Sequence, residues 1–184
     1  MGYTMGAMIR EQIIVGPLSA VDYTVGEAGV SHLVTLINGE TLVETPDGIS
    51  IENHLRLSMN DITQPQPGLV PPHQDHVAEL IDFTIAWDQL GPMMVHCWAG
   101  ISRSTAAAFI MLCTLNPRSD EEHIARQIRD ASPTATPNLR LVRLADELLA
   151  RKGRMVSAIE SIGRGQMAIE AEVFVLPARL AKAA

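Results

Sequence analysis

The segment from Met93 to Leu115 constrains the fold most strongly, because it joins a short apolar strand to an apolar helix through a glycine-containing loop. Met93 to His96 has the composition of a buried strand, and Ser104 to Leu115 that of a buried helix that stops before Pro117. A loop that leaves a strand and enters a helix directs its backbone N–H groups into one concavity, where the helix dipole adds partial positive charge. The sequence therefore predicts an anion-binding loop at the end of a strand.

The remaining segments alternate strands with helices early in the chain and accumulate helices late. Apolar runs predict strands at residues 11–15, 31–37, 54–57, 93–96 and 172–176. Helical spacing predicts helices at residues 19–28, 73–90, 104–115, 119–129, 138–149 and 154–162, with Ser119 and Asn138 as N-caps of two of them. This order predicts an α/β fold with a central, mostly parallel sheet flanked by helices. Residues 59–72 form a Pro- and Gly-rich loop of a length that is typical of functional loops.

Composition excludes several classes of partner. The net charge of −7 argues against generic binding to nucleic acid or to an anionic membrane, and the aromatic content of 4% argues against stacking on single-stranded nucleic acid. Two cysteines are too few for a disulfide framework and favour a reducing, cytoplasmic location. The first twelve residues lack a signal-peptide core, and Gly6 stands where a myristoylation motif needs Ser or Thr. The excess of Arg over Lys, twelve to two, indicates a bacterial source with a GC-rich genome.

The predicted loop carries the residues of nucleophilic chemistry on a phosphoryl group. Cys97 stands at its base, where loop amides, the helix dipole and Arg103 favour a thiolate. The planar guanidinium of Arg103 can bind two phosphoryl oxygens, and Ser104 can donate a hydrogen bond to the sulfur. Gly100 permits the unusual backbone that the loop needs.

These residues, in the order His96, Cys97, Gly100, Arg103 and Ser104, resemble the H-C-x-x-G-x-x-R-[S/T] signature of the cysteine-based protein tyrosine phosphatases. The short chain, the late position of the motif and a Pro-Asn pair before a helix resemble the dual-specificity branch of that superfamily. The resemblance implies a catalytic domain over residues 1–150 and leaves residues 151–184 as a C-terminal extension, which we expect to pack on the same domain.

The resemblance also implies a two-step phosphate monoester hydrolysis without metal or cofactor. Cys97 forms a phosphocysteine, and an Asp on a separate loop protonates the leaving group and then activates water. The family places this Asp some thirty-odd residues before the cysteine, after a strand, and Asp61 meets both conditions. Asp47 precedes that strand and Asp75 begins the next helix, so both fit less well.

The other site residues take supporting parts in this hypothesis. The loop residues Trp98, Ala99, Gly100, Ile101, Ser102 and Arg103 are expected to bind the phosphoryl group, or a phosphate or sulfate anion. His96 is expected to orient the loop, and Asn138 to brace it as well as to cap a helix.

Several further residues are better explained by structure than by chemistry. Cys113 is expected to be buried filler rather than a redox thiol, and His73 and His76 an exposed helix start rather than a metal site. The basic residues Arg151, Lys152, Arg154 and Arg164 are expected to form a solvated helix face.

The loop also bears on the substrate. It contains no Lys, whereas relatives that act on inositol lipids tend to carry Lys there, and its apolar residues suit an aryl phosphate. The sequence thus predicts a protein-tyrosine phosphatase that acts on phosphorylated proteins or peptides and that also accepts phosphoserine and phosphothreonine. Two alternatives stay open: a phosphate-binding module without turnover, and a rhodanese-like sulfurtransferase, which has a similar Cys-x5-Arg loop.

Overall fold

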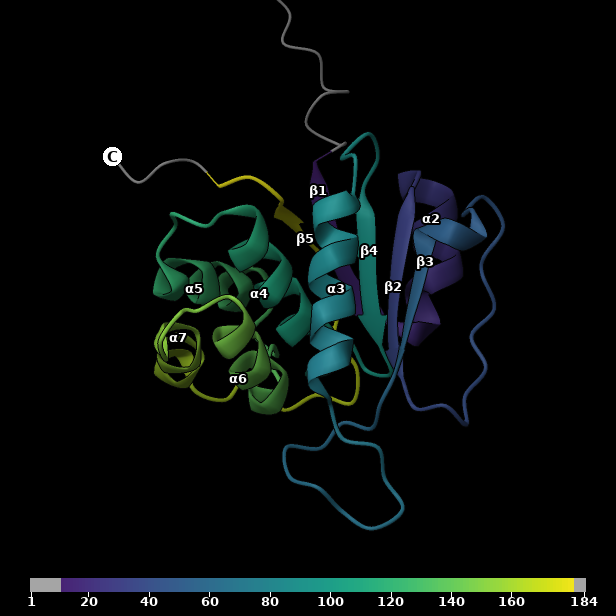
Figure 1. Ribbon diagram of the computed structural model, residues 1–184. Helices are drawn as coiled ribbons and strands as arrows, with labels where there is room; N and C mark the ends of the chain where they lie inside the picture. Colours follow the sequence, from purple (N-terminus) through teal and green to yellow (C-terminus); the bar gives the residue numbers. More distant parts are fainter. Residues whose placement is uncertain (1–10, 181–184) are drawn as a thin grey trace, which may run out of the picture.

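One mixed sheet organises the computed structural model, which describes residues 11–180 (Figure 1). Its strands are β1 (Gln12–Pro17), β2 (His32–Ile37), β3 (His54–Ser58), β4 (Met93–Cys97) and β5 (Phe174–Pro177), in the order β3-β2-β4-β1-β5. The first four are mutually parallel, and β5 runs antiparallel to β1 at one edge. The predicted α/β fold with a mostly parallel sheet is confirmed. The predictions about a signal peptide and a myristoylation motif concern the N-terminal residues, of which 1–10 lie outside the described residues. The first residues of the predicted catalytic domain and the last of the predicted C-terminal extension, 181–184, also lie outside them.

Helices cover the two faces of the sheet unequally. The helical elements are η1 (Leu18–Ala20), α2 (Val21–Ala28), η2 (Ile51–Asn53), α3 (Gln74–Ala86), α4 (Arg103–Leu115), α5 (Glu121–Ala131), α6 (Leu139–Leu148) and α7 (Arg154–Ile162). α3 to α7 gather on one side, with α4 packed on β1 and β4, whereas α2 lies on the other side (Figure 1). Among residues 11–180, no helix has both the length and the apolar composition that crossing a bilayer requires.

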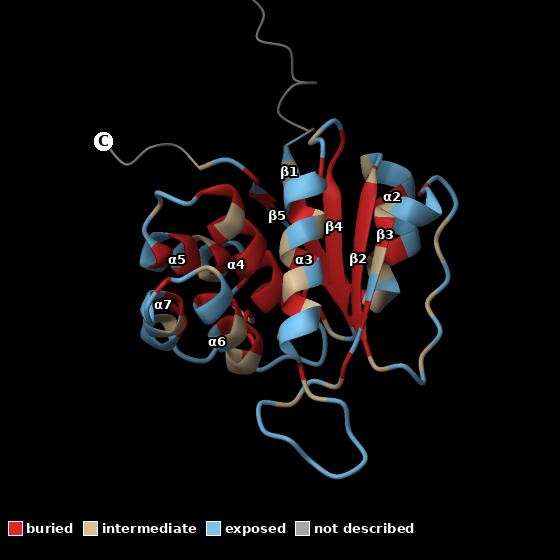
Figure 2. Cartoon of the chain, viewed as in Figure 1, coloured by how far each residue is buried: buried red, intermediate tan, exposed pale blue. Residues whose placement is uncertain are grey.

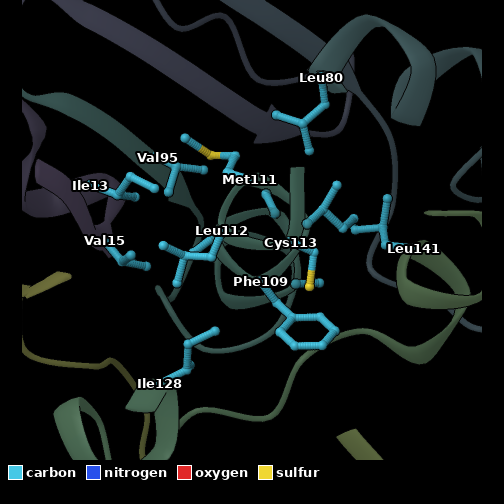
Figure 3. Close-up of a cluster of buried hydrophobic side chains, with 14 of the residues drawn as sticks. Ile13, Val15, Leu80, Val95, Phe109, Met111, Leu112, Cys113, Ile128 and Leu141 are labelled. Atoms are coloured by element: carbon cyan, nitrogen blue, oxygen red, sulfur yellow. The ribbon is translucent and has the colours of Figure 1, made fainter. Parts of the chain in front are cut away.

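The central strands are buried on both faces, because successive side chains point to opposite sides of a sheet. In β1, Ile13 and Val15 belong to the large core under α4, whereas Ile14 joins the smaller core under α2. Figure 2 shows this burial along β2 and β4 and through α4. Figure 3 shows the side chains of α4 in this core, namely Phe109, Met111, Leu112 and Cys113. Around them lie side chains from the sheet (Ile13, Val15 and Val95) and from the neighbouring helices (Leu80, Ile128 and Leu141).

Several predicted helix boundaries were wrong by one or more residues, and two of the errors have a clear structural cause. α3 ends at Ala86 rather than Leu90, because the Trp87 ring is buried and donates from Nε1 to the Gly91 carbonyl (3.1 Å), which turns the chain out of the helix. In the last turn of α3, Thr84 is buried and Ile85 is exposed. α5 is capped by Asp120, whose carboxylate accepts from the Glu122 amide (2.9 Å), and not by Ser119.

The segment after residue 150 packs against the elements before it. α7 lies on α5 and α6, and β5 extends the sheet along β1. The expected solvated basic face is wrong for Arg151, which is buried and donates to Glu121 Oε1 (2.9 Å) and to the Cys113 carbonyl (2.8 Å). Lys152, Arg154 and Arg164 are exposed as expected. The charge of Arg151 is thus used to join the C-terminal segment to α4 and α5.

Candidate active site

The loop between β4 and α4 is held from outside through its carbonyl oxygens. Four backbone amides donate to it, from Leu18 to Trp98 (3.2 Å), from Ala171 to Ala99 (2.9 Å), from Thr136 to Ile101 (2.9 Å) and from Asn138 to Ser102 (3.2 Å). In a planar trans peptide the N–H points away from the C=O, so the amides of these same peptide units face the inside of the loop. Converging amides of this kind form an anion-binding concavity. The geometry matches the anion loop that the sequence predicts.

Gly100 is required by both its backbone angle and its surroundings. Its φ of +72° lies in the left-handed region. A Cβ atom at this position would lie 2.8 Å from the carbonyl carbon of Gly16 and 2.8 Å from the nitrogen of Pro17. The loop therefore touches the end of β1 directly, and any side chain would push the two apart.

Cys97 is the last residue of β4, and its side chain is buried at the base of the loop. Its Sγ lies 3.2 Å from Oγ of Ser104 in the first turn of α4. A thiolate accepts a hydrogen bond, so with Cys97 deprotonated the Ser104 hydroxyl is the donor. The contact that the sequence suggested between these two residues is present.

Arg103 is buried beside the loop and presents an unsatisfied donor there. Its Nη1 donates to the Met59 carbonyl (2.8 Å), which fixes the guanidinium. Its Nε is buried without a hydrogen-bond partner among the described residues and lies 3.9 Å from Oδ2 of Asp61. A buried N–H without an acceptor costs about 1–3 kcal/mol, and an anionic oxygen in the loop would relieve that cost.

Asp61 reaches the loop from the segment after β3. Its Oδ1 accepts from Ser102 Oγ (2.8 Å) and from Asn138 Nδ2 (2.8 Å). Asn138 also caps α6, since its Oδ1 accepts from the amides of Arg140 (3.0 Å) and Leu141 (3.2 Å). One side chain thus links the cap of α6, the carboxylate and the loop. The two other acidic candidates, at positions 47 and 75, are exposed, one in a turn before β3 and one in the first turn of α3.

A cavity of about 990 Å³ opens beside these groups. Asp61, Ser102 and Asn138 lie on its wall together with Arg164 from the segment after α7. The site therefore combines a buried thiol, a guanidinium, a carboxylate and a space for the group attached to the anion. Such an arrangement can attack a tetrahedral oxyanion from below and donate a proton to the departing group from above.

His96 lies behind the loop rather than in it. It is fully buried on β4, and burial lowers its pKa to about 4. Its Nε2 lies 2.7 Å from Thr35 Oγ1, which lies 2.8 Å from Nε2 of His54, and burial likewise lowers the pKa of His54 to about 4. Both imidazoles are neutral at pH 7.

Acidification is expected to destabilise the fold between pH 6.5 and pH 4. The unfolded chain protonates His54 and His96 near 6.5 and the folded chain only near 4, so the unfolded state binds more protons in this window. The free energy of unfolding should fall by about 1–3 kcal/mol per histidine as pH drops through it. Urea unfolding at pH 7, 5.5 and 4.5 measures this fall, and H54Q should show a shallower one. A free energy of unfolding that is equal at pH 7 and pH 5 would contradict the expectation.

The residues expected to be structural have structural surroundings. Cys113 lies on α4 and is buried, and burial raises the pKa of its thiol far above the usual range. His76 Nδ1 accepts from the His73 amide (3.1 Å) at the start of α3. Within residues 11–180, no group of three or more His, Cys, Asp or Glu side chains is arranged to hold a metal ion.

Several contacts at the site could not be found from the sequence. These contacts are made by backbone groups, namely the amides of Leu18, Thr136 and Ala171 and the carbonyl of Met59. Any residue could supply the carbonyl, and any residue other than proline could supply an amide N–H. Thr35 did leave a signal, because it is the one polar residue inside the apolar run from Leu33 to Ile37.

Comparison with known proteins finds one family model and several solved structures that are similar to this chain. Residues 53–139 match the family model described as protein-tyrosine phosphatase. A search of curated proteins finds no match. Similar solved structures include DUSP15 (20% identity, TM-score 0.56, 81% of this chain and 90% of that one) and human DUSP28 (18%, 0.58, 79% and 97%). PTPMT1 in complex with PI(5)P is another (18%, 0.58, 76% and 90%). At these identities the structures establish a shared fold.

Proposed function

We propose that this chain, which matches the protein-tyrosine phosphatase family model over residues 53–139 and has the dual-specificity type of fold, is a cysteine-based phosphatase that hydrolyses phosphate monoesters through a phosphocysteine on Cys97. One observation carries the proposal: the side chains of Cys97, Arg103 and Asp61 lie around one loop, whose amides face inward. In the first step the thiolate attacks phosphorus, an S–P bond forms and the P–O bond to the leaving group breaks. Asp61 gives its proton to the departing oxygen.

The second step returns the enzyme to its starting state. Asp61 takes a proton from water, whose oxygen attacks phosphorus, and the S–P bond breaks to release inorganic phosphate and the Cys97 thiolate. The Ser104 hydroxyl, 3.2 Å from the sulfur, supports the proposal because it can stabilise this thiolate as a leaving group. Arg103 and the amides of residues 99, 100, 102 and 103 would neutralise the phosphoryl oxygens, which leaves no step that needs a metal ion.

The substrate class that we propose is phosphotyrosine in proteins, with phosphoserine and phosphothreonine as further substrates. Trp98 is 57% exposed at the loop, where an apolar surface suits an aromatic ring. Inositol lipids are the competing class, since the similar structure of PTPMT1 contains PI(5)P. The loop without Lys and the net charge of −7 favour the singly phosphorylated aryl group. The two free thiols fit a cytoplasmic location.

Phosphate release from a phosphotyrosine peptide, with chelator present and no added metal, tests the proposal. Wild type should turn over, and C97S should not, because an alcohol at this position is a far weaker nucleophile. PI(5)P, a phosphoserine peptide and thiosulfate with cyanide run in parallel at equal concentration.

Each other outcome selects a different function. Faster release from PI(5)P would overturn the substrate class and keep the mechanism. Peptide binding without turnover in wild type would leave a phosphate-binding module. Thiocyanate formation from thiosulfate, lost in C97S, would identify a sulfurtransferase instead.

A further inference from the structure

A continuous chain of side-chain hydrogen bonds runs from the surface to the carbonyl of the nucleophile. Its members lie on β4, β2 and β3 and on the loop before β3. At the surface end, Nη2 of Arg56 lies 2.6 Å from Oγ1 of Thr45, which lies 3.0 Å from Nδ1 of His54. Nε2 of His54 lies 2.8 Å from Oγ1 of Thr35, which lies 2.7 Å from Nε2 of His96. At the buried end, Nδ1 of His96 lies 3.4 Å from the Cys97 carbonyl oxygen.

The two ends of this chain determine the direction of every bond in it. The Cys97 carbonyl can only accept, so the proton of His96 is on Nδ1 and its Nε2 accepts from the Thr35 hydroxyl. The Thr35 oxygen then accepts from Nε2–H of His54, whose Nδ1 accepts from the Thr45 hydroxyl. The Thr45 oxygen in turn accepts from Arg56, which can only donate. In the opposite direction, a lone pair of His96 would face the carbonyl oxygen, and the Thr45 proton would have no acceptor in the chain.

The sheet places these groups with little freedom to rearrange. Thr35 stands directly opposite His96 in the β2–β4 register and opposite Arg56 in the β2–β3 register. Thr35, His54 and His96 are all buried, so an unmade bond at any of them would cost desolvation energy. Arg56 is held at the far end by a second bond, from Nε to the Val43 carbonyl (3.0 Å).

We propose that Thr35 and His54 are positioning residues that orient Cys97 through the fixed Nδ1–H tautomer of His96. This inference rests on the proposed function only in taking Cys97 as the nucleophile. The donor at the Cys97 carbonyl holds the peptide from which the thiolate projects and reduces the negative potential beside it. Removal of the Thr35 hydroxyl leaves Nε2 of His96 without its donor, so the imidazole and the bond from its Nδ1–H to that carbonyl are held less firmly.

Nitrogen-15 NMR of the imidazoles tests the direction of the chain in the wild-type protein. His96 should be protonated on Nδ1 and His54 on Nε2 at pH 7. The opposite tautomer at either histidine would overturn the proposal.

The matched pair T35V and T35S tests the effect on Cys97. T35V keeps the volume and loses the hydroxyl, whereas T35S keeps the hydroxyl. T35V should lower kcat about five- to tenfold, as expected for one lost hydrogen bond, with KM little changed, and T35S should restore kcat to within about twofold of wild type. Thr84 is a buried threonine on α3 that takes no part in this chain of hydrogen bonds, so T84V controls for the general cost of replacing a buried threonine by valine.

Alkylation of Cys97 by iodoacetamide gives a readout that needs no phosphatase substrate. Peptide mass spectrometry separates Cys97 from Cys113, and the pH of half-maximal alkylation rate should move upward in T35V and stay in place in T84V. Unchanged kcat and alkylation in folded T35V would overturn the proposal. If T35V does not fold, T45V, in the partly exposed loop, replaces it. The pH of half-maximal alkylation should then move upward by a smaller amount. No change in T45V would overturn the proposal. Absence of turnover in wild type would refute the function while the alkylation and NMR results still decide the positioning role.

Discussion

Replacement of Asp61 by Asn is expected to lower kcat on a phosphotyrosine peptide about 10²- to 10⁴-fold, the usual contribution of a general acid–base group. The change is isosteric, and the amide oxygen can still accept from Ser102 and Asn138, so the bracing of the loop should survive. What is lost is the transferable proton. The measurement is steady-state phosphate release, together with thermal unfolding to confirm an intact fold.

A further readout separates proton transfer from a structural role of Asp61. A good leaving group, such as a nitro-substituted aryl phosphate, needs no proton, so the defect of D61N in the first step should shrink with it. D47N and D75N are the matched controls and should turn over as wild type does. A loss in D61N that is equal for good and poor leaving groups would contradict the acid assignment.

Replacement of Arg151 by Met is expected to lower the free energy of unfolding by about 3 kcal/mol or more, because it leaves a buried carboxylate short of its partner. Glu121 has a side chain only 6% exposed, and Arg151 bonds it at 2.9 Å. The same guanidinium also satisfies the carbonyls of Cys113 (2.8 Å) and Pro117 (3.3 Å). Arg154 still contacts Glu121 at 3.2 Å in the variant, which keeps the loss toward the lower end of the range for a broken buried pair.

The chain offers a matched control for this prediction. R154M removes the second cation from the same carboxylate, but that guanidinium is 54% exposed, so the loss should stay below about 1 kcal/mol. Urea unfolding of both variants at pH 7 measures the difference. The double variant R151M/E121L removes the stranded charge and should recover part of the stability lost in R151M. Equal losses in R151M and R154M would show that burial of the pair contributes nothing.

Most of the helices and strands were predictable because their signals are local. Period-two and continuous apolar runs marked β1 to β4, and α7 begins and ends where its pattern does. The errors arose where a tertiary contact overrode the periodicity. Trp87 is buried through a bond to Gly91 beyond the helix, and Arg151 is drawn inward by a carboxylate thirty residues earlier.

The amino-acid sequence by itself determined the chemistry available at the loop. A cysteine at a strand end, a glycine, and an arginine in the first turn of the next helix are separated by few residues, so chain connectivity alone holds them together. The resemblance to the phosphatase family indicated Asp61, because that family carries its acid on a loop after a strand some thirty-odd residues before the cysteine. In the structure the loop after β3 leaves the sheet at the same edge as the loop after β4, since the strands between them are parallel.

Only the tertiary structure decided what surrounds the loop. The amides of Leu18, Thr136 and Ala171 come from three distant segments, and backbone donors leave no trace in the residue types that carry them. The pairing of Thr35 with His96 depends on the register of β2 against β4, which strand composition does not specify. The shape of the site thus depends on long-range packing, whereas its reactive groups are local in the chain.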